Sequence, residues 1–312
     1  MHLSSQKEDT MHINVNNTTL YFDVAGSEIS VDRERLRARP TLVVLPGGPG
    51  FDHGYLRPGL AELVADAQVV FVDLRGQGRS SPAPAESCSL EQMADDVAAL
   101  CRALGIPRPV IFGHSAGGFV ALHLALRHPR LPVGLILCHT TPTLAPLPDA
   151  HPPAGVSQRG GAEAAAVAAR LFGGDFSRTT GEAFARLVFP YYAAPGQEHI
   201  PNQLMALSSM NTDVAAHFFA EIAPGYDLRP RLGDIAAPTL VIVGRHDWVC
   251  PPAGGRAMAS AIPAAQLVEL PNAGHFGFSE TPQPFLAAVR GHLADIETSR
   301  PSAPAVRQPR AA

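Results

Sequence analysis

The pentapeptide Gly113-His114-Ser115-Ala116-Gly117 is the part of the sequence that most clearly carries chemistry. A short apolar run at 110–112 precedes it, and an almost wholly apolar stretch of helical length follows at 118–126. A serine on a tight strand-to-helix turn needs small neighbours, because its backbone is strained and its flanks crowd the sheet. We therefore predict that Ser115 is a nucleophile and that His114 forms part of the substrate-binding wall.

Asp247 and His275 stand where a serine nucleophile would need them. A serine hydroxyl requires a base within hydrogen-bond reach, and a carboxylate must orient that base. Asp247 follows an apolar run at 239–243, and His275 follows another at 266–270. The chain order serine, acid, histidine is that of α/β hydrolases. We predict that His275 is the general base and that Asp247 orients it.

The loop Pro46-Gly47-Gly48-Pro49-Gly50 follows another apolar run, at 41–45. Its glycines allow the backbone to approach a substrate oxygen, and acyl transfer needs two N–H groups aimed at the developing negative charge. We predict that Gly48 and Ala116 supply these groups and that Gly47 contacts the substrate. His139 and His53 are further histidines that could border the site.

Alternating runs and helical stretches predict the elements that hold these residues. Short apolar runs separated by helices are typical of a parallel sheet covered on both faces. An apolar stripe with helical spacing predicts a helix near 90–104, and Asn16-Asn17 between two alternating runs predicts a hairpin. The predicted runs are 12–15, 19–24, 41–45, 69–73, 110–113, 133–138, 239–243 and 266–270.

The alternation of apolar runs and helical stretches stops for about a hundred residues after residue 138. This stretch begins rich in proline and glycine and continues with a helical pattern, which indicates helices inserted between two strands of one sheet. We expect a core at 11–140 and 231–297 and a helical cap at 141–230. Residues 1–10 are expected to be a flexible tail, and 298–312 a disordered one.

Composition limits the possible functions. The 312-residue chain has a formal net charge of −4 and no basic stripe, so we expect no nucleic-acid partner. Its four cysteines follow no disulfide or zinc spacing, and no metal-binding motif or cofactor is indicated. The N-terminal region has no apolar signal segment, and no apolar run reaches the roughly 18 residues of a membrane helix. We expect a cytoplasmic protein without a membrane partner, of undetermined oligomeric state.

Taken together, the motifs resemble the proline iminopeptidase-like α/β-hydrolases. The motifs that carry the resemblance are PGGPG at 46–50, DLRGQGRS at 73–80, GHSAGG at 113–118, GRHDW at 244–248 and AGHF at 273–276. The resemblance implies the α/β-hydrolase fold, with a mostly parallel central sheet, helices on both faces and an inserted helical cap over the serine. It also implies that Asp73 and Arg75 hold loops near the site.

The chain departs from that family at two points. The family's aminopeptidases resemble HGGPG at the first loop, where this chain has Pro46, and GGSWG at the nucleophile, where it has His114 and Ala116. Neither departure affects the three predicted reaction residues. Both favour the esterase, lactonase and amidase members.

Three functions follow as alternatives. By resemblance the chain is an aminopeptidase acting through an acyl-enzyme on a short peptide, which requires a cap carboxylate for the substrate ammonium. Glu221 is the best placed candidate, ahead of Asp213, Glu198 and Asp227. The second function is hydrolysis of a small carboxylic ester or lactone in an apolar pocket. The third is a non-catalytic binding protein, against which the complete set of reaction residues argues.

Overall fold

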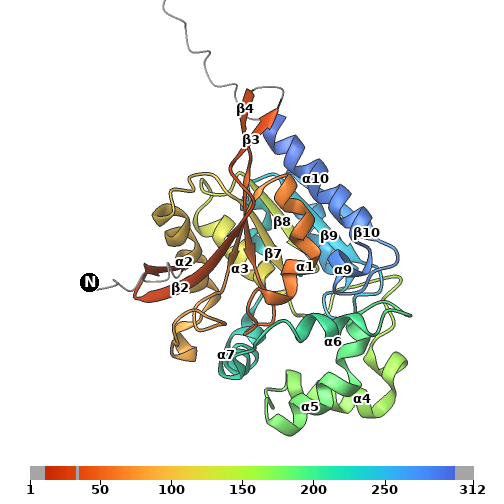
Figure 1. The fold of residues 1–312 in the computed structure, drawn as a ribbon. Helices are drawn as coiled ribbons and strands as arrows, with labels where there is room; N and C mark the ends of the chain where they lie inside the picture. Colours follow the sequence, from red (N-terminus) through yellow and green to blue (C-terminus); the bar gives the residue numbers. More distant parts are fainter. Residues whose placement is uncertain (1–10, 33–34, 299–312) are drawn as a thin grey trace, which may run out of the picture.

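The computed structural model describes residues 11–32 and 35–298, and it contains an eight-stranded sheet with helices on both faces (Figure 1). The tails predicted at 1–10 and 298–312 lie outside these residues, except for Thr298. The strands are β1 (His12–Val15), β2 (Thr18–Ala25), β3 (Ile29–Asp32), β4 (Arg35–Ala38), β5 (Thr41–Leu45), β6 (Gln68–Val72), β7 (Val110–His114), β8 (Gly134–Cys138), β9 (Thr239–Gly244) and β10 (Ala265–Leu270). The α-helices are α1 (Arg57–Leu60), α2 (Leu90–Ala103), α3 (Ala116–Arg127), α4 (Val156–Phe172), α5 (Arg178–Leu187), α6 (Ile200–Met205), α7 (Thr212–His217), α8 (Pro252–Ala261), α9 (Gly277–Glu280) and α10 (Pro282–Thr298).

The sheet has the strand order β1-β2-β6-β5-β7-β8-β9-β10. β1 and β2 are antiparallel to each other, β2 is antiparallel to β6, and every later pairing in that order is parallel. Each predicted run is a strand. Asn16 and Asn17 have φ of 42° and 61°, the left-handed values that a two-residue hairpin turn requires.

Two apolar layers enclose the sheet because successive strand residues point to opposite faces. In β5, Val43 and Leu45 belong to one layer, which α2, α3 and α8 cover. Leu42 and Val44 belong to the other layer, which α1 and α10 cover. The stripe predicted near 90–104 is the buried side of α2. The parallel strands are thus fixed from both faces, and their carboxyl ends are held in place.

Helices α4 to α7 all lie between β8 and β9 in the chain, and Figure 1 shows them gathered at one edge of the sheet. The short 3₁₀ segment Phe189–Tyr192 lies between α5 and α6, and the π-helical turn Phe218–Ile222 follows α7. β3 and β4 form a separate hairpin that the sequence pattern did not predict. No helix in the described ranges is long and apolar enough to cross a membrane.

Candidate active site

Ser115 lies between β7 and α3 on a sharp backbone turn. Its φ of 52° and ψ of −123° are strained values for a residue with a side chain. The turn is tight: a Cβ at Gly117 would collide with the carbonyl oxygen of Leu45 in the neighbouring strand. The Ser115 N–H donates to the Cys138 carbonyl at the end of β8, 3.0 Å away. The strained turn therefore presents the serine at the carboxyl edge of the sheet.

Asp247 and His275 form a buried pair beyond the ends of β9 and β10. His275 Nδ1 lies 2.8 Å from Asp247 Oδ2, and both side chains are almost wholly inaccessible. The other oxygen of Asp247 accepts the backbone N–H groups of Val249 and Cys250, each at 2.9 Å. Burial acts to raise the pKa of Asp247, but His275 and His139 outweigh it and hold this pKa well below the usual range. Asp247 is therefore an anion that fixes the imidazole ring.

A second histidine, His139, approaches the same carboxylate. Its Nδ1 lies 3.5 Å from Asp247 Oδ2, and its Nε2 accepts the N–H of Gly277 at 3.1 Å. An imidazole that accepts at Nε2 carries its proton on Nδ1 when neutral, so this proton faces Asp247. His139 directly follows β8, which is why sequence order alone placed it near the site. Its contact with Asp247 was not predicted.

Ser115, His275 and Cys250 line the same cavity. No hydrogen bond joins Ser115 and His275 within the described chain. Such contacts are often long in a free enzyme and tighten when substrate binds. Burial raises the pKa of the Cys250 thiol well above its usual value, so the thiol beside Ser115 is neutral.

The loop at 46–50 lies against the nucleophile. A Cβ at Gly47 would lie 2.7 Å from the Ser115 Cβ, so only glycine fits there. The Gly47 N–H donates to the Tyr55 hydroxyl at 2.7 Å and is not free for a substrate. Gly48 lines the cavity, while Ala116 is the first residue of α3 and has no earlier helical carbonyl for its N–H. The geometry is thus compatible with the Gly48 and Ala116 N–H groups as donors to a substrate oxyanion. Gly47, which was predicted to contact the substrate, instead holds the loop in place through Tyr55.

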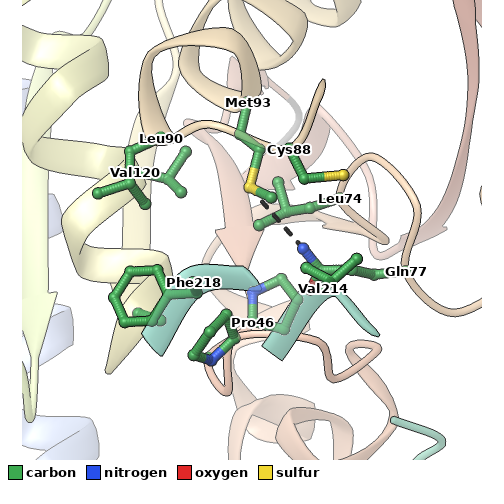
Figure 2. A pocket seen from close by; sticks show the side chains of 12 residues that line it. Pro46, Leu74, Gln77, Cys88, Leu90, Met93, Val120, Val214 and Phe218 are labelled. Atoms are coloured by element: carbon green, nitrogen blue, oxygen red, sulfur yellow. Dashed lines mark hydrogen bonds between the residues drawn. The ribbon is translucent and has the colours of Figure 1, made fainter. Parts of the chain in front are cut away.

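The motif at 73–80 supports this loop through a residue that the sequence did not single out. Gln77 Oε1 accepts the Gly50 N–H at 3.1 Å, and Gln77 Nε2 lies 3.8 Å from Met93 Sδ. Figure 2 shows this contact at a small apolar void of about 10 Å³ behind the loop. Asp73 accepts the backbone N–H groups of His53 and Arg79 and also binds the His53 ring, so it holds loop segments as the resemblance implied. Arg75 binds Asp96 in α2.

His114 is buried beside the serine and does not extend freely into the cavity. Its Nδ1 lies 2.7 Å from the Tyr55 hydroxyl, and its Nε2 lies 2.9 Å from the His275 carbonyl oxygen. Its ring lines part of the cavity, but protein groups take both ring nitrogens. Tyr55 also belongs to this site, and no motif or spacing in the sequence indicated it.

A cavity of about 540 Å³ opens over Ser115 and His275. Side chains from the inserted helices form much of its wall, together with residues 248–250 and the loop at 46–51. None of its lining residues is aspartate, glutamate, lysine or arginine. The aromatic part of the lining comprises Phe51, Tyr55, Phe119, Phe172, Phe176, Phe184, Phe189, Tyr192, Phe218, Phe219, Trp248 and Phe276.

Glu221, expected to bind substrate, is exposed and does not line the cavity. It lies in the π-helical turn with Phe218 and Phe219, which both face the cavity. Because the two apolar rings take the inner face, the carboxylate is left on the outer one. Glu198 and Asp227 pair with Arg159 and Arg229. The structure therefore brings together every predicted reaction residue but not the predicted ammonium anchor.

The chain belongs to the α/β-hydrolase fold family, whose model matches residues 40–282. A relative from Pseudomonas syringae pv. syringae (strain B728a), named as a carbamate hydrolase (RutD), is 30% identical over 258 residues, covering 82% of this chain and 94% of its own. A thermophilic esterase from Thermogutta terrifontis superimposes with a TM-score of 0.68 at 29% identity, covering 92% of this chain and 97% of that one.

A proline iminopeptidase from Mycobacterium smegmatis also has the same fold, as the sequence resemblance implied. Its TM-score is 0.68 at 23% identity, with coverage of 93% of this chain and 99% of that one. The chain is thus a hydrolase of the α/β fold. Among the described residues, no group of three or more His, Cys, Asp or Glu side chains is arranged so that it could hold a metal ion.

Proposed function

We propose that the protein is a serine hydrolase that cleaves a carboxylic ester with an uncharged, apolar acyl group through an acyl-enzyme. The observation that carries this proposal is the cavity over Ser115 and His275, whose wall is aromatic and lacks Asp, Glu, Lys and Arg side chains. An ammonium group that entered this cavity would lose its hydration and find no carboxylate to pair with, and burying an unpaired charge costs free energy. The similarity to an esterase agrees with this chemistry.

In this mechanism Ser115 Oγ attacks the ester carbonyl carbon while His275 Nε2 takes the hydroxyl proton. The N–H groups of Gly48 and Ala116 stabilise the oxyanion. Collapse of the tetrahedral intermediate breaks the ester bond, and His275 returns the proton to the departing alcohol. A water then attacks the acyl-enzyme by the same route, releasing the acid. Asp247 stays ionised and stabilises the imidazolium. The inserted helices act as a cap that supplies the acyl pocket.

A substrate panel tests the proposal. We expect p-nitrophenyl butyrate and octanoate to be hydrolysed with kcat/KM at least about 10²-fold above prolyl- and alanyl-naphthylamides, since an unpaired buried charge costs several kcal/mol. A lactone of similar size belongs with the esters. Ser115→Ala should lower kcat about 10³- to 10⁶-fold for every substrate, with unchanged melting temperature.

Glu221→Gln is the matched control for the aminopeptidase alternative. Because Glu221 lies outside the cavity, we expect equal kcat/KM in this variant and the wild type for both substrate classes. A selective loss of naphthylamide cleavage in Glu221→Gln would overturn the ester assignment. An active Ser115→Ala enzyme would overturn the serine mechanism.

A further inference from the structure

A continuous chain of hydrogen bonds runs beside the nucleophile and joins the loop at 46–50 to His275. The Gly47 N–H lies 2.7 Å from Tyr55 Oη, and Tyr55 Oη lies 2.7 Å from His114 Nδ1. His114 Nε2 lies 2.9 Å from the His275 carbonyl oxygen. Tyr55 and His114 are both buried. Two side chains thus connect the three backbone segments that carry the proposed reaction groups.

Elementary hydrogen-bond chemistry fixes the direction of this chain. A backbone N–H only donates and a carbonyl only accepts. Tyr55 therefore accepts from Gly47 and gives its single proton to His114 Nδ1. His114 then carries its own proton on Nε2 and donates it to the His275 carbonyl. This proton arrangement satisfies every polar atom of the chain.

Burial favours the same arrangement. It raises the pKa of Tyr55 above its usual value, and the Tyr55 hydroxyl stays protonated. Burial is also the largest cause that lowers the pKa of His114 well below its usual value, followed by the electrostatic effect of the neighbouring His275 and His139 rings. Tyr55 and His114 therefore remain neutral, and the chain keeps its direction across the working pH range.

We propose that Tyr55 and His114 are positioning residues that set the distance between the oxyanion loop and the backbone of His275. This inference rests on the proposed serine mechanism, in which the N–H of Gly48 binds the oxyanion while the imidazole of His275 takes the Ser115 proton in the same step. Gly48 directly follows Gly47, so Tyr55 controls it through one peptide unit. Displacing such groups by about 1 Å can cost 10²-fold in rate. Neither side chain transfers a proton to substrate.

Tyr55→Phe breaks the first two links while keeping the ring. For p-nitrophenyl butyrate we expect kcat to fall at least about tenfold with KM changed less than twofold, because only transition-state contacts are weakened. Phenylboronic acid adds to Ser115 Oγ and forms a tetrahedral adduct with an oxygen at the oxyanion position. Its inhibition constant should rise by the same factor as kcat falls.

Two substitutions at His114 separate the halves of the chain. Asn retains an acceptor near the position of Nδ1 and loses the link to His275. Gln retains a donor near the position of Nε2 and loses the link to Tyr55. We expect each to lower kcat as Tyr55→Phe does. The double variant Tyr55→Phe/His114→Gln should lose no more than His114→Gln alone, because one broken link already disconnects the loop at 46–50 from the His275 backbone.

Tyr226→Phe is the matched control, since Tyr226 is also buried and its hydroxyl donates to the Thr141 carbonyl at 2.9 Å. It should lower the melting temperature and leave kcat and the boronic acid constant unchanged. The positioning role is overturned if Tyr55→Phe and both His114 variants behave like Tyr226→Phe, with unchanged kcat and boronic acid constant. Additive losses in the double variant would also overturn it. An active Ser115→Ala enzyme would instead overturn the proposed function itself.

Discussion

In the described part of the chain two buried histidine–aspartate pairs are joined by a hydrogen bond, His275–Asp247 and His53–Asp73, and they differ in what lies at the far nitrogen of the histidine. His275 Nδ1 lies 2.8 Å from Asp247, and His53 Nδ1 lies 2.6 Å from Asp73. All four side chains are almost wholly buried. In each pair burial acts to raise the pKa of the aspartate, yet its histidine and other donors bring that pKa below the usual value.

The environments of the two Nε2 atoms separate the pairs. His53 Nε2 lies 3.2 Å from a guanidinium nitrogen of Arg79, which can only donate. His53 must therefore accept there and has no lone pair left for a substrate proton. His275 instead borders the cavity beside Ser115. A buried histidine–aspartate pair is thus not a catalytic signature, and the group facing Nε2 decides its role.

Replacing the two histidines gives the largest expected contrast. We expect His275→Ala to lower kcat by about 10⁴- to 10⁶-fold while changing stability little. His53→Ala removes the imidazole partner of buried Asp73, which keeps Arg79, and should lower the free energy of unfolding by about 1–3 kcal/mol, with kcat within about tenfold of wild type. Ester kinetics and urea denaturation on both variants check this. Comparable kinetic losses would mean that the two pairs are not distinct in function.

The aspartates should show a smaller version of the same contrast. Asp247→Asn keeps the shape but frees the imidazole to adopt the wrong tautomer, and we expect kcat to fall by about 10⁴-fold. Asp73→Asn should leave kcat within about threefold and weaken stability. Steady-state kinetics on folded variants decides between these outcomes. An Asp247→Asn enzyme with nearly wild-type kcat would remove Asp247 from the mechanism.

The smallest expected effect concerns stability in acid. Both aspartates have folded-state pKa values below the ordinary value of about 3.9, so their contribution is present in full above that pH. It is lost as the pH falls from about 4 toward the folded-state pKa. We expect the free energy of unfolding to decline over this range, and in Asp73→Asn the slope should be shallower by up to about 1.4 kcal/mol per pH unit. Identical slopes would contradict a depressed pKa at Asp73.

Sequence patterns could predict the strands, and the edge of the sheet at which Ser115, Asp247 and His275 lie, because both follow from short apolar runs in the chain. Ser115, Asp247 and His275 each follow an apolar run, and the carboxyl ends of parallel strands share one edge. Tyr55 could not be assigned in the same way, and for His139 the position beyond a strand end could be predicted but its contact with Asp247 could not. Their contacts join residues such as Tyr55 and His114, 59 positions apart, and depend on how the layers pack.

Glu221 shows a second limit of sequence reasoning. Its neighbours Phe218 and Phe219 are adjacent and both face the cavity, so no helical periodicity identifies an inner face. The turn at 218–222 is also π-helical, with wider turns than the α-helix on which such patterns rest. The hairpin of β3 and β4 escaped prediction for another reason. Ile29, Val31 and Leu36 are exposed, so these strands have no buried face whose apolar pattern could have indicated them.

The two ends of the inserted segment, at residues 142–143 and 227–228, lie paired side by side, and this has an evolutionary consequence. Where this segment leaves and rejoins the core, Thr143 bridges to Asp227, and the Leu228 N–H donates to the Pro142 carbonyl at 2.8 Å. The ends of the excursion are therefore closed by their own pairing, next to the adjacent strands β8 and β9. Chain length between closed ends costs little free energy, so helices can be added, lost or exchanged without disturbing the register of the sheet. A junction closed in this way lets the insertion change in length and sequence while the strands that precede the proposed reaction residues keep their pairing.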